Sequence, residues 1–86
     1  MGLTLATAVQ RSKLILEQAG IESAAIDARV LVKHVCDVND TYLFTYPEKP
    51  LSEPQQVLLD EVLNRRAEGE PVAYIVGYRD FWDLRL

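Results

Sequence analysis

The chain of 86 residues has few of the features that mark membrane or secreted proteins. Its one cysteine, Cys36, cannot form an internal disulfide, so a reducing compartment is expected. Its longest apolar run, Val72–Val76, has five residues, whereas a membrane-spanning helix needs about 20. The N-terminus lacks the basic flank and apolar stretch of a secretory signal. Together these absences predict a cytoplasmic protein with no membrane partner.

Basic residues are too few to indicate a nucleic-acid-binding protein. Nine Lys and Arg stand against thirteen Asp and Glu, which gives a formal net charge of −4. Negative charge opposes the counterion release that drives nonspecific binding to nucleic acids, and it opposes attraction to anionic membranes. Arg65 and Arg66 are the one adjacent basic pair. We therefore expect no direct contact with nucleic acid.

The length and composition fit one small globular domain. Hydrophobic residues make up 49% of the chain and charged residues 26%, as in ordinary soluble domains. A chain of this size buries about 60 to 65% of its unfolded surface, which suffices for one core but not for a core and a large cofactor cleft. An autonomous, complex enzyme is therefore disfavoured.

Residues recur at helical spacing in two segments before residue 37. Thr4 is placed to cap the first helix, and Gly20 can end it in the left-handed conformation. Ser23 is placed to cap the second helix, and Asp27 suits the positive end of its dipole. The turn-forming stretch 37–40 then ends the second helix. The residues on the two stripes are Leu5, Ala8, Val9, Ser12, Leu16 and Ala19, followed by Ala24, Ala28, Leu31 and Val35.

Prolines and glycines divide the rest of the helical region into separate helices. A short helix is predicted over 41–46, before three prolines stiffen a connector. Ser52 and Gln55 have the spacing of a capping box, which begins a long fourth helix. Arg65 and Arg66 complement the dipole in its last turn, and a glycine follows at position 69. The apolar face of this fourth helix consists of Leu58, Leu59, Val62 and Leu63.

The last part of the chain changes its periodicity. Pro71 is placed at the first position of a fifth helix over 72–76, which Gly77 ends. Beyond it, Trp82, Leu84 and Leu86 alternate with charged residues, as in a half-buried strand.

A lone strand cannot satisfy its backbone hydrogen-bonding groups, so its partner is expected beyond this chain. The predicted fold class is all-α, a small bundle of about five helices over residues 1–77. The start of a β-hairpin linker is predicted over residues 78–86. We therefore expect these residues to be an N-terminal piece of a longer protein.

Two blocks of the sequence resemble one enzyme family. The first block is Arg65-Arg66-Ala67-Glu68-Gly69-Glu70-Pro71-Val72-Ala73-Tyr74-Ile75-Val76-Gly77-Tyr78-Arg79-Asp80-Phe81-Trp82-Asp83-Leu84, with the pattern R-R-x-x-G-E-P-x-x-Y-x-x-G-x-x-x-F-W-x-L. The second is Ala19-Gly20-Ile21-Glu22-Ser23 with Asp27-Ala28-Arg29-Val30-Leu31. These blocks resemble the N-terminal domain of the HemK-type protein-glutamine N5-methyltransferases, and their separation is that of the family.

The resemblance implies a substrate-recognition role for this chain. In that family a five-helix domain is joined by a β-hairpin to an S-adenosylmethionine-dependent methyltransferase domain. The parent enzyme methylates the glutamine of the Gly-Gly-Gln loop of class 1 peptide chain release factors, and its N-terminal domain helps to hold this protein substrate. Release factor and the chain's own catalytic domain are thus the implied partners, and S-adenosylmethionine is the cofactor of the parent enzyme.

No catalytic or cofactor-binding residue is carried over from the family. Its Asn-Pro-Pro-Tyr motif is absent, because Asn39 precedes Asp40 and Asn64 precedes Arg65. The four glycines are scattered singly, so there is no glycine-rich turn to bind the cofactor. The fragment is therefore predicted to be inactive alone. Its parent is expected to be a release factor glutamine N5-methyltransferase.

Residues near the C-terminus are candidate contacts with a partner or with the missing domain. For the arginines of the fourth helix and Glu70, the alternative is a solvated role beside the helix dipole. Arg79 lies among aromatic residues, a mixture enriched at interface hot spots. Gly69 and Gly77 are either hinges or helix ends that need positive φ. The six candidates are Arg65, Arg66, Glu70, Arg79, Phe81 and Trp82.

Other residues admit a functional and a structural interpretation. His34 and Cys36 lie two apart on a helix and point away from each other, so no metal site or nucleophile is assigned. The aromatic residues at positions 42, 44 and 46 either form a surface patch or pack under the proline connector. The residues expected to be buried together are Ala8, Val9, Leu16, Leu31, Val35, Leu58, Val62 and Tyr74.

Two other functions compete with the family interpretation. One is a stand-alone helical protein-interaction adaptor with no link to methylation. The other is an acidic acyl carrier, but no Asp-Ser-Leu sequence is present to take its prosthetic group. The intact mass of the natural protein separates the adaptor from the fragment of an enzyme.

Overall fold

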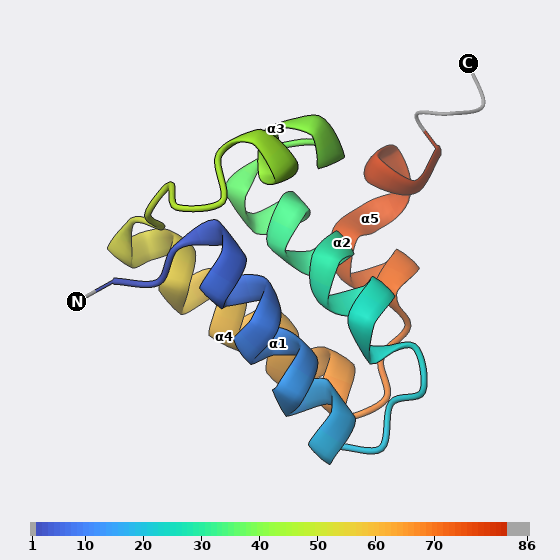
Figure 1. The fold of residues 1–86 in the computed structure, drawn as a ribbon. Coiled ribbons are helices and arrows are strands. Elements are labelled where there is room, and N and C mark those ends of the chain that lie inside the picture. The colour runs from blue at the N-terminus through green and yellow to red at the C-terminus, as the bar shows by residue number, and fades with distance from the viewer. Residues whose placement is uncertain (1, 83–86) are drawn as a thin grey trace.

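The structure, a computed structural model, describes the backbone of residues 2–82 and the side chains of residues 2–77. Within this part, five helices and no sheet are present, which confirms the predicted all-α class (Figure 1). The helices are α1 (Leu5–Gln18), α2 (Ala24–Cys36), α3 (Asp40–Thr45), α4 (Glu53–Ala67) and α5 (Val72–Trp82).

Capping side chains begin α1 and α4 at the predicted residues. The Thr4 hydroxyl accepts the Thr7 N–H, and the Thr7 side chain completes a capping box. At α4, the Ser52 hydroxyl accepts the Gln55 N–H, while Gln55 Oε1 accepts the Ser52 N–H at 2.8 Å. These caps satisfy backbone donors that have no partner inside the helix.

The N-terminus of α2 is built differently from the prediction. Ser23 occupies the cap position, but its side chain makes no capping hydrogen bond. Its hydroxyl instead donates to Asp27 Oδ2 at 2.8 Å. The carboxylate competes successfully for the hydroxyl because a charged acceptor makes a stronger hydrogen bond than a neutral one.

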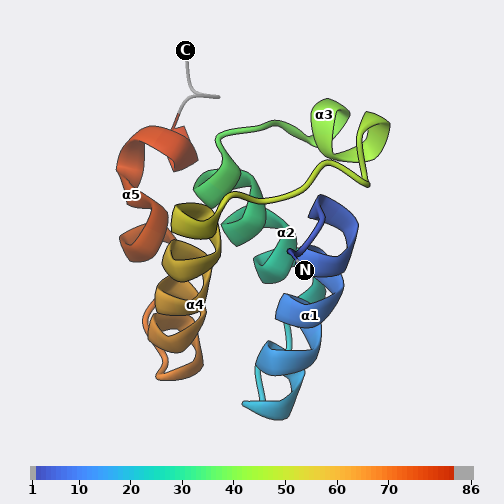
Figure 2. The ribbon, with the colours of Figure 1, turned by 90° about the vertical axis from the view of Figure 1, so that its left-hand side faces the viewer.

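The core lies where α1, α2 and α4 meet, and α5 packs against both α2 and α4 (Figures 1 and 2). α1 and α2 run in opposite directions beside each other (Figure 1). Of the residues expected to be buried, five are buried and Val9 is partly buried against them. The fourteen buried apolar residues are Leu5, Ala8, Leu16, Ala24, Ala28, Leu31, Val32, Val35, Leu51, Leu59, Val62, Leu63, Ile75 and Val76.

The prediction of burial is wrong for two residues, Leu58 and Tyr74. Leu58 is 41% exposed and Tyr74 is 66% exposed. In each case the next residue, Leu59 or Ile75, is buried instead. One position along a helix turns a side chain by about 100°, so an error of one residue moves it from the core to solvent.

The proline connector is fixed by the N-terminal segment. The Leu5 N–H donates to the carbonyl oxygen of Lys49 at 2.9 Å, and the Leu51 N–H donates to that of Leu3 at 2.7 Å. The side chain of Leu51 is buried in the core. The connector is thus held to the bundle by backbone hydrogen bonds on one side and by an apolar anchor on the other.

α3 lies at the edge of the bundle, where Tyr42 and Leu43 are partly buried against the core. The side chain of Asn39 caps it by accepting the Tyr42 N–H at 2.8 Å, close to the predicted start at residue 41. None of its residues is buried. Phe44 is 91% exposed and Tyr46, which follows the helix, is 51% exposed. These two residues therefore form a surface patch rather than packing under the proline connector.

α5 is interrupted at Gly77. Its φ of 84° and ψ of 161° lie in a region that residues with a side chain rarely adopt. The predicted end of a helix at this glycine is thus observed as a break, and the backbone is helical again through residue 82. The prediction that the β-hairpin linker starts at residue 78 is therefore wrong for residues 78–82, which are helical. Leu84 and Leu86 of the expected strand lie outside the described residues, so a β-hairpin beyond residue 82 stays a prediction.

Candidate functional site

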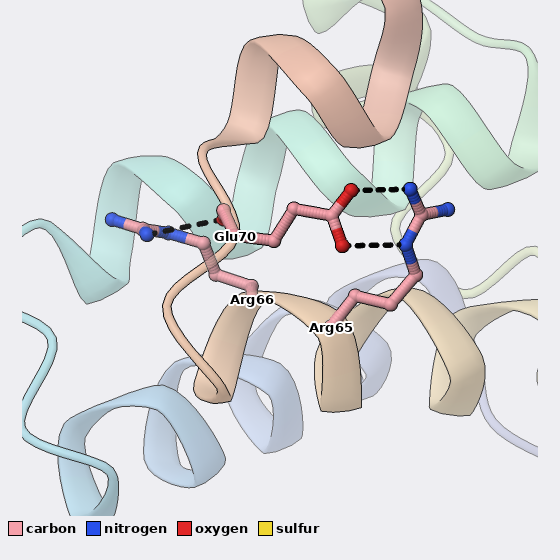
Figure 3. Close-up of polar contacts among 3 residues, drawn as sticks. All are labelled: Arg65, Arg66 and Glu70. Carbon is pink, nitrogen blue, oxygen red and sulfur yellow. Dashed lines mark hydrogen bonds and ion pairs between the residues drawn. The ribbon is translucent and has the colours of Figure 1, made fainter.

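The turn between α4 and α5 brings three of the six candidate residues together. Gly69, with a φ of 106°, lets the chain reverse direction after α4. The Gly69 N–H donates to the carbonyl oxygen of Arg66 at 2.9 Å, and the Glu70 N–H donates to that of Arg65 at 3.1 Å. This pair of bonds is a Schellman motif. It folds Glu70 back toward the two arginines (Figure 3).

Arg65 and Glu70 form an ion pair through two hydrogen bonds. Arg65 Nε donates to Glu70 Oε1 at 2.9 Å, and Nη2 donates to Oε2 (Figure 3). The bonding to Arg65 lowers the pKa of the Glu70 carboxyl, and the carboxylate in turn raises the pKa of Arg65. Both side chains are partly exposed, so water weakens the attraction between their charges.

Arg66 turns away from Arg65 and makes a more buried ion pair. Its Nε donates to Asp27 Oδ2 at 2.8 Å, and its Nη1 donates to the Glu70 carbonyl oxygen at 3.3 Å. The side chains of Arg66 and Asp27 are 19% and 10% exposed. Because the Ser23 hydroxyl also donates to Asp27 Oδ2, this oxygen has two donors.

These contacts define the α4–α5 clamp, which consists of Asp27, Arg65, Arg66 and Glu70. The clamp joins α2 to the end of α4 and to Glu70, the residue before Pro71. α5 begins directly after Pro71. Its charges are satisfied by one another. The arrangement therefore holds three elements in place.

The internal pairing changes how the candidate residues are interpreted. Arg65, Arg66 and Glu70 were expected either to contact a partner or to be solvated, and the structure pairs them inside the domain. Contact with a partner stays a prediction for them. The side chains of Arg79, Phe81 and Trp82 lie outside the described residues.

Sequence reasoning missed Asp27 as the partner of Arg66. The two residues are 39 positions apart, and Asp27 was assigned to the helix dipole alone. A signal was present, since Asp27 lies between Ala24 and Leu31 on the buried face of α2. A charged residue on an apolar face needs a partner, because an unpaired buried charge is unfavourable.

The described residues contain no group of three or more His, Cys, Asp or Glu that could hold a metal ion. Burial raises the pKa of the Cys36 thiol, which reduces the amount of the reactive thiolate. In the same part of the chain, no helix is long and apolar enough to cross a bilayer.

Five helices around one core, fastened at the α4–α5 turn by ion pairs, place the chain in the class of small all-α domains. The family model described as the PrmC N-terminal domain matches residues 7–77. The chain therefore belongs to the family of PrmC N-terminal domains. Both sequence blocks of the resemblance overlap this range, and Asp27 of one is bonded to Arg66 of the other.

Curated relatives extend the comparison. The chain is 44% identical over its full length to a release factor glutamine methyltransferase of Aliivibrio fischeri and 43% identical to one of Vibrio cholerae. It spans 30% of the length of each of these relatives. It is also 40% identical to the Escherichia coli enzyme of this name over 76% of the chain, which is 24% of that relative. No solved structure matches the chain.

Proposed function

We propose that this chain is the substrate-binding domain of a larger methyltransferase that modifies peptide chain release factors. Family membership carries this proposal, together with the 30% of each full-length relative that the chain spans. The parent enzyme would transfer a methyl group from S-adenosylmethionine to the glutamine of the Gly-Gly-Gln loop of a class 1 release factor. We expect this reaction in the cytoplasm.

The division of labour follows from the chemistry of the acceptor. An amide nitrogen is a poor nucleophile because its lone pair is delocalised into the carbonyl group. It must therefore be held in line with the methyl group that it accepts. We assign that task, and the binding of S-adenosylmethionine, to the part of the parent protein outside these 86 residues. This chain has no Asn-Pro-Pro-Tyr sequence and no glycine-rich turn.

The helical bundle would contribute by holding the protein substrate away from the reacting atoms. Binding energy gathered at a distance can fix orientation at the reacting centre. The clamp supports this role because it fastens the start of α5 to α2 and α4. α5 is also the described helix nearest the C-terminus, so it leads toward the catalytic domain that we propose.

Comparing two forms of the parent protein tests the proposal. We would measure methylation of an intact class 1 release factor by the full-length protein and by a form that starts after Leu86. We expect the shortened form to have a much lower kcat/KM on the release factor. Its activity on a short Gly-Gly-Gln peptide should be preserved, which shows that the catalytic part is folded. Equal turnover of the release factor by both forms would remove the recognition role.

A further inference from the structure

The surface formed by α3 and the following turn lies outside the clamp, and only Tyr42 and Leu43 of α3 pack against the core. We define the α3 patch as Phe44 and Tyr46, together with Tyr42, whose ring centroid is 4.7 Å from that of Tyr46. Phe44 is the most exposed of the exposed large hydrophobic residues in the described part of the chain, at 91%. The Phe44 side chain contributes nothing to the core. Its helix is nevertheless capped, and the rings of Tyr42 and Tyr46 beside it contact each other.

The backbone around the patch is fixed. The Lys49 N–H donates to the carbonyl oxygen of Tyr46 at 3.1 Å, and the Ala6 N–H of α1 donates to that of Pro47 at 2.9 Å. Asp40 at the start of α3 is paired with Lys33 of α2 at 2.9 Å. The hydrogen bond from Lys33 lowers the pKa of the Asp40 carboxyl. The aromatic residues therefore lie on a segment whose backbone is held by hydrogen bonds and by the Asp40–Lys33 ion pair.

The charge around the patch indicates the chemistry of its occupant. Residues 37–54 contain four carboxylates and one lysine, so this stretch has a net charge of −3 within a chain of −4. Asp40 is paired, but no ion pair is found in the described part of the chain for Glu48 or Glu53. Exposed aromatic rings beside carboxylates suit Arg and Lys, which stack on the rings and pair with the acids.

The same charge disfavours two other classes of occupant. Nucleic acid and anionic lipid surfaces are polyanions, and both would be repelled by this stretch. A protein surface that presents Arg or Lys next to an apolar side chain fits both parts of the patch. Under the proposed function, the protein partner of this domain is the release factor, so a surface of that kind on the release factor is the expected occupant.

The position of the patch also suits a substrate that spans two domains. In both views, α3 and the C-terminal part of α5 lie at the same end of the bundle (Figures 1 and 2). In Figure 2 they lie on opposite sides of that end. A partner bound at α3 would thus lie at the end from which the chain continues without covering α5.

From these observations we infer that the α3 patch binds an Arg- or Lys-bearing surface of the release factor, with Phe44 as its central contact. This inference rests on the proposed function and adds to it the face of the domain that meets the substrate. Aromatic residues are enriched at protein interfaces, and truncation of a central contact has a large effect on affinity.

Binding measurements with the full-length protein test this inference. The affinity for a purified class 1 release factor would be compared between the wild type, Phe44→Ser and the matched control Val57→Ser. Val57 is 64% exposed but belongs to α4, away from α3. We expect Phe44→Ser to raise Kd about tenfold or more and Val57→Ser to change it less than about twofold. Glu48→Lys should weaken binding at low salt, and this difference should shrink at high salt.

The possible results separate this inference from the proposed function. If the wild type binds the release factor and Phe44→Ser binds equally well, the α3 patch is not the contact surface, while the proposed function stands. If the wild type does not bind the release factor, both fail. If Phe44→Ser leaves Kd unchanged but lowers the melting temperature or the turnover of a short Gly-Gly-Gln peptide, the patch packs against the protein's own catalytic part. Binding of the wild type to anionic vesicles that Phe44→Ser abolishes would also overturn the inference.

Discussion

The α4–α5 clamp and the α3 patch reverse the usual distribution of residue types. In the clamp, a charged residue, Asp27, is largely buried and is fully paired with Arg66. In the patch, an aromatic residue, Phe44, is almost fully exposed. Charged residues are rarely buried unless they are paired, and large apolar residues on a surface indicate a contact when they occur together. From residue types alone, the charged clamp would therefore be placed on the surface and the aromatic patch in the core.

The largest effect expected is a loss of stability in the core that has no counterpart at α3. Leu31 is fully buried, so Leu31→Ala should lower the free energy of unfolding by about 4 kcal/mol through lost burial and a residual cavity. Phe44→Ala should change it by less than about 0.5 kcal/mol, because the side chain is already in water. Urea unfolding of both variants measures the difference. A large loss for Phe44→Ala would show that α3 is part of the core.

A smaller effect is expected from breaking the buried pair of the clamp. Arg66→Ala leaves Asp27 without its charged partner at a site that is 10% exposed, so unfolding should become easier by about 3 kcal/mol. Arg65→Ala is the matched control one residue away, and its loss should be smaller because its pair with Glu70 is partly solvated. Thermal unfolding of the two variants ranks them. Equal losses would mean that burial does not distinguish the two ion pairs.

Where α2 ends and the chain turns toward α3, a substitution should increase stability. Asp37 has a φ of 57°, which is unfavourable for residues with a side chain, and its carboxylate lies at the negative end of the helix dipole. Asp37→Gly removes both effects and should stabilise the domain by about 1 kcal/mol. Asp37→Asn removes only the charge and should give a smaller gain. Denaturant midpoints measure the series, and a destabilised glycine variant would contradict this explanation.

The smallest effect expected is a dependence of stability on pH through Glu70. Pairing with Arg65 lowers the pKa of its carboxyl below the ordinary value of 4.5. Its stabilising contribution is therefore complete above pH 4.5 and is lost as the pH falls through the lowered pKa. Glu70→Gln should be less stable than the wild type at neutral pH, and the gap should close in acid. Melting temperatures across the acid range check this, and a constant gap would exclude the ion pair as its cause.

Local signals in the sequence predicted most helix boundaries. The capping box of Ser52 and Gln55 and the glycines after α1 and α4 act over a few residues, so the chain carries them wherever the helix packs. The errors at Leu58 and Tyr74 arose where the choice lay between adjacent apolar residues. Which of two neighbours faces the core depends on the rotation of a helix against its partners, and no local signal fixes that rotation.

The candidate site was predicted less completely than the fold. Arg65, Arg66 and Glu70 lie together at one turn, but their bonding was not predicted, and their contact with a partner stays a prediction. Asp27 reaches Arg66 across 39 positions of the chain, and its pairing depends on the packing of α2 against α4. The two interpretations of the aromatic residues of α3 were both open from the sequence, because their exposure depends on where the connector lies.

By itself the sequence determined five helices, the caps of α1 and α4 and the family, because these rest on short-range hydrogen bonding, periodicity and contiguous motifs. Only the tertiary structure decided that Asp27 and Arg66 hold each other and that Phe44 stands in water. Both outcomes depend on which surfaces of different helices meet. That choice minimises exposed apolar area and unpaired charge over the whole domain, and it is made by no segment alone.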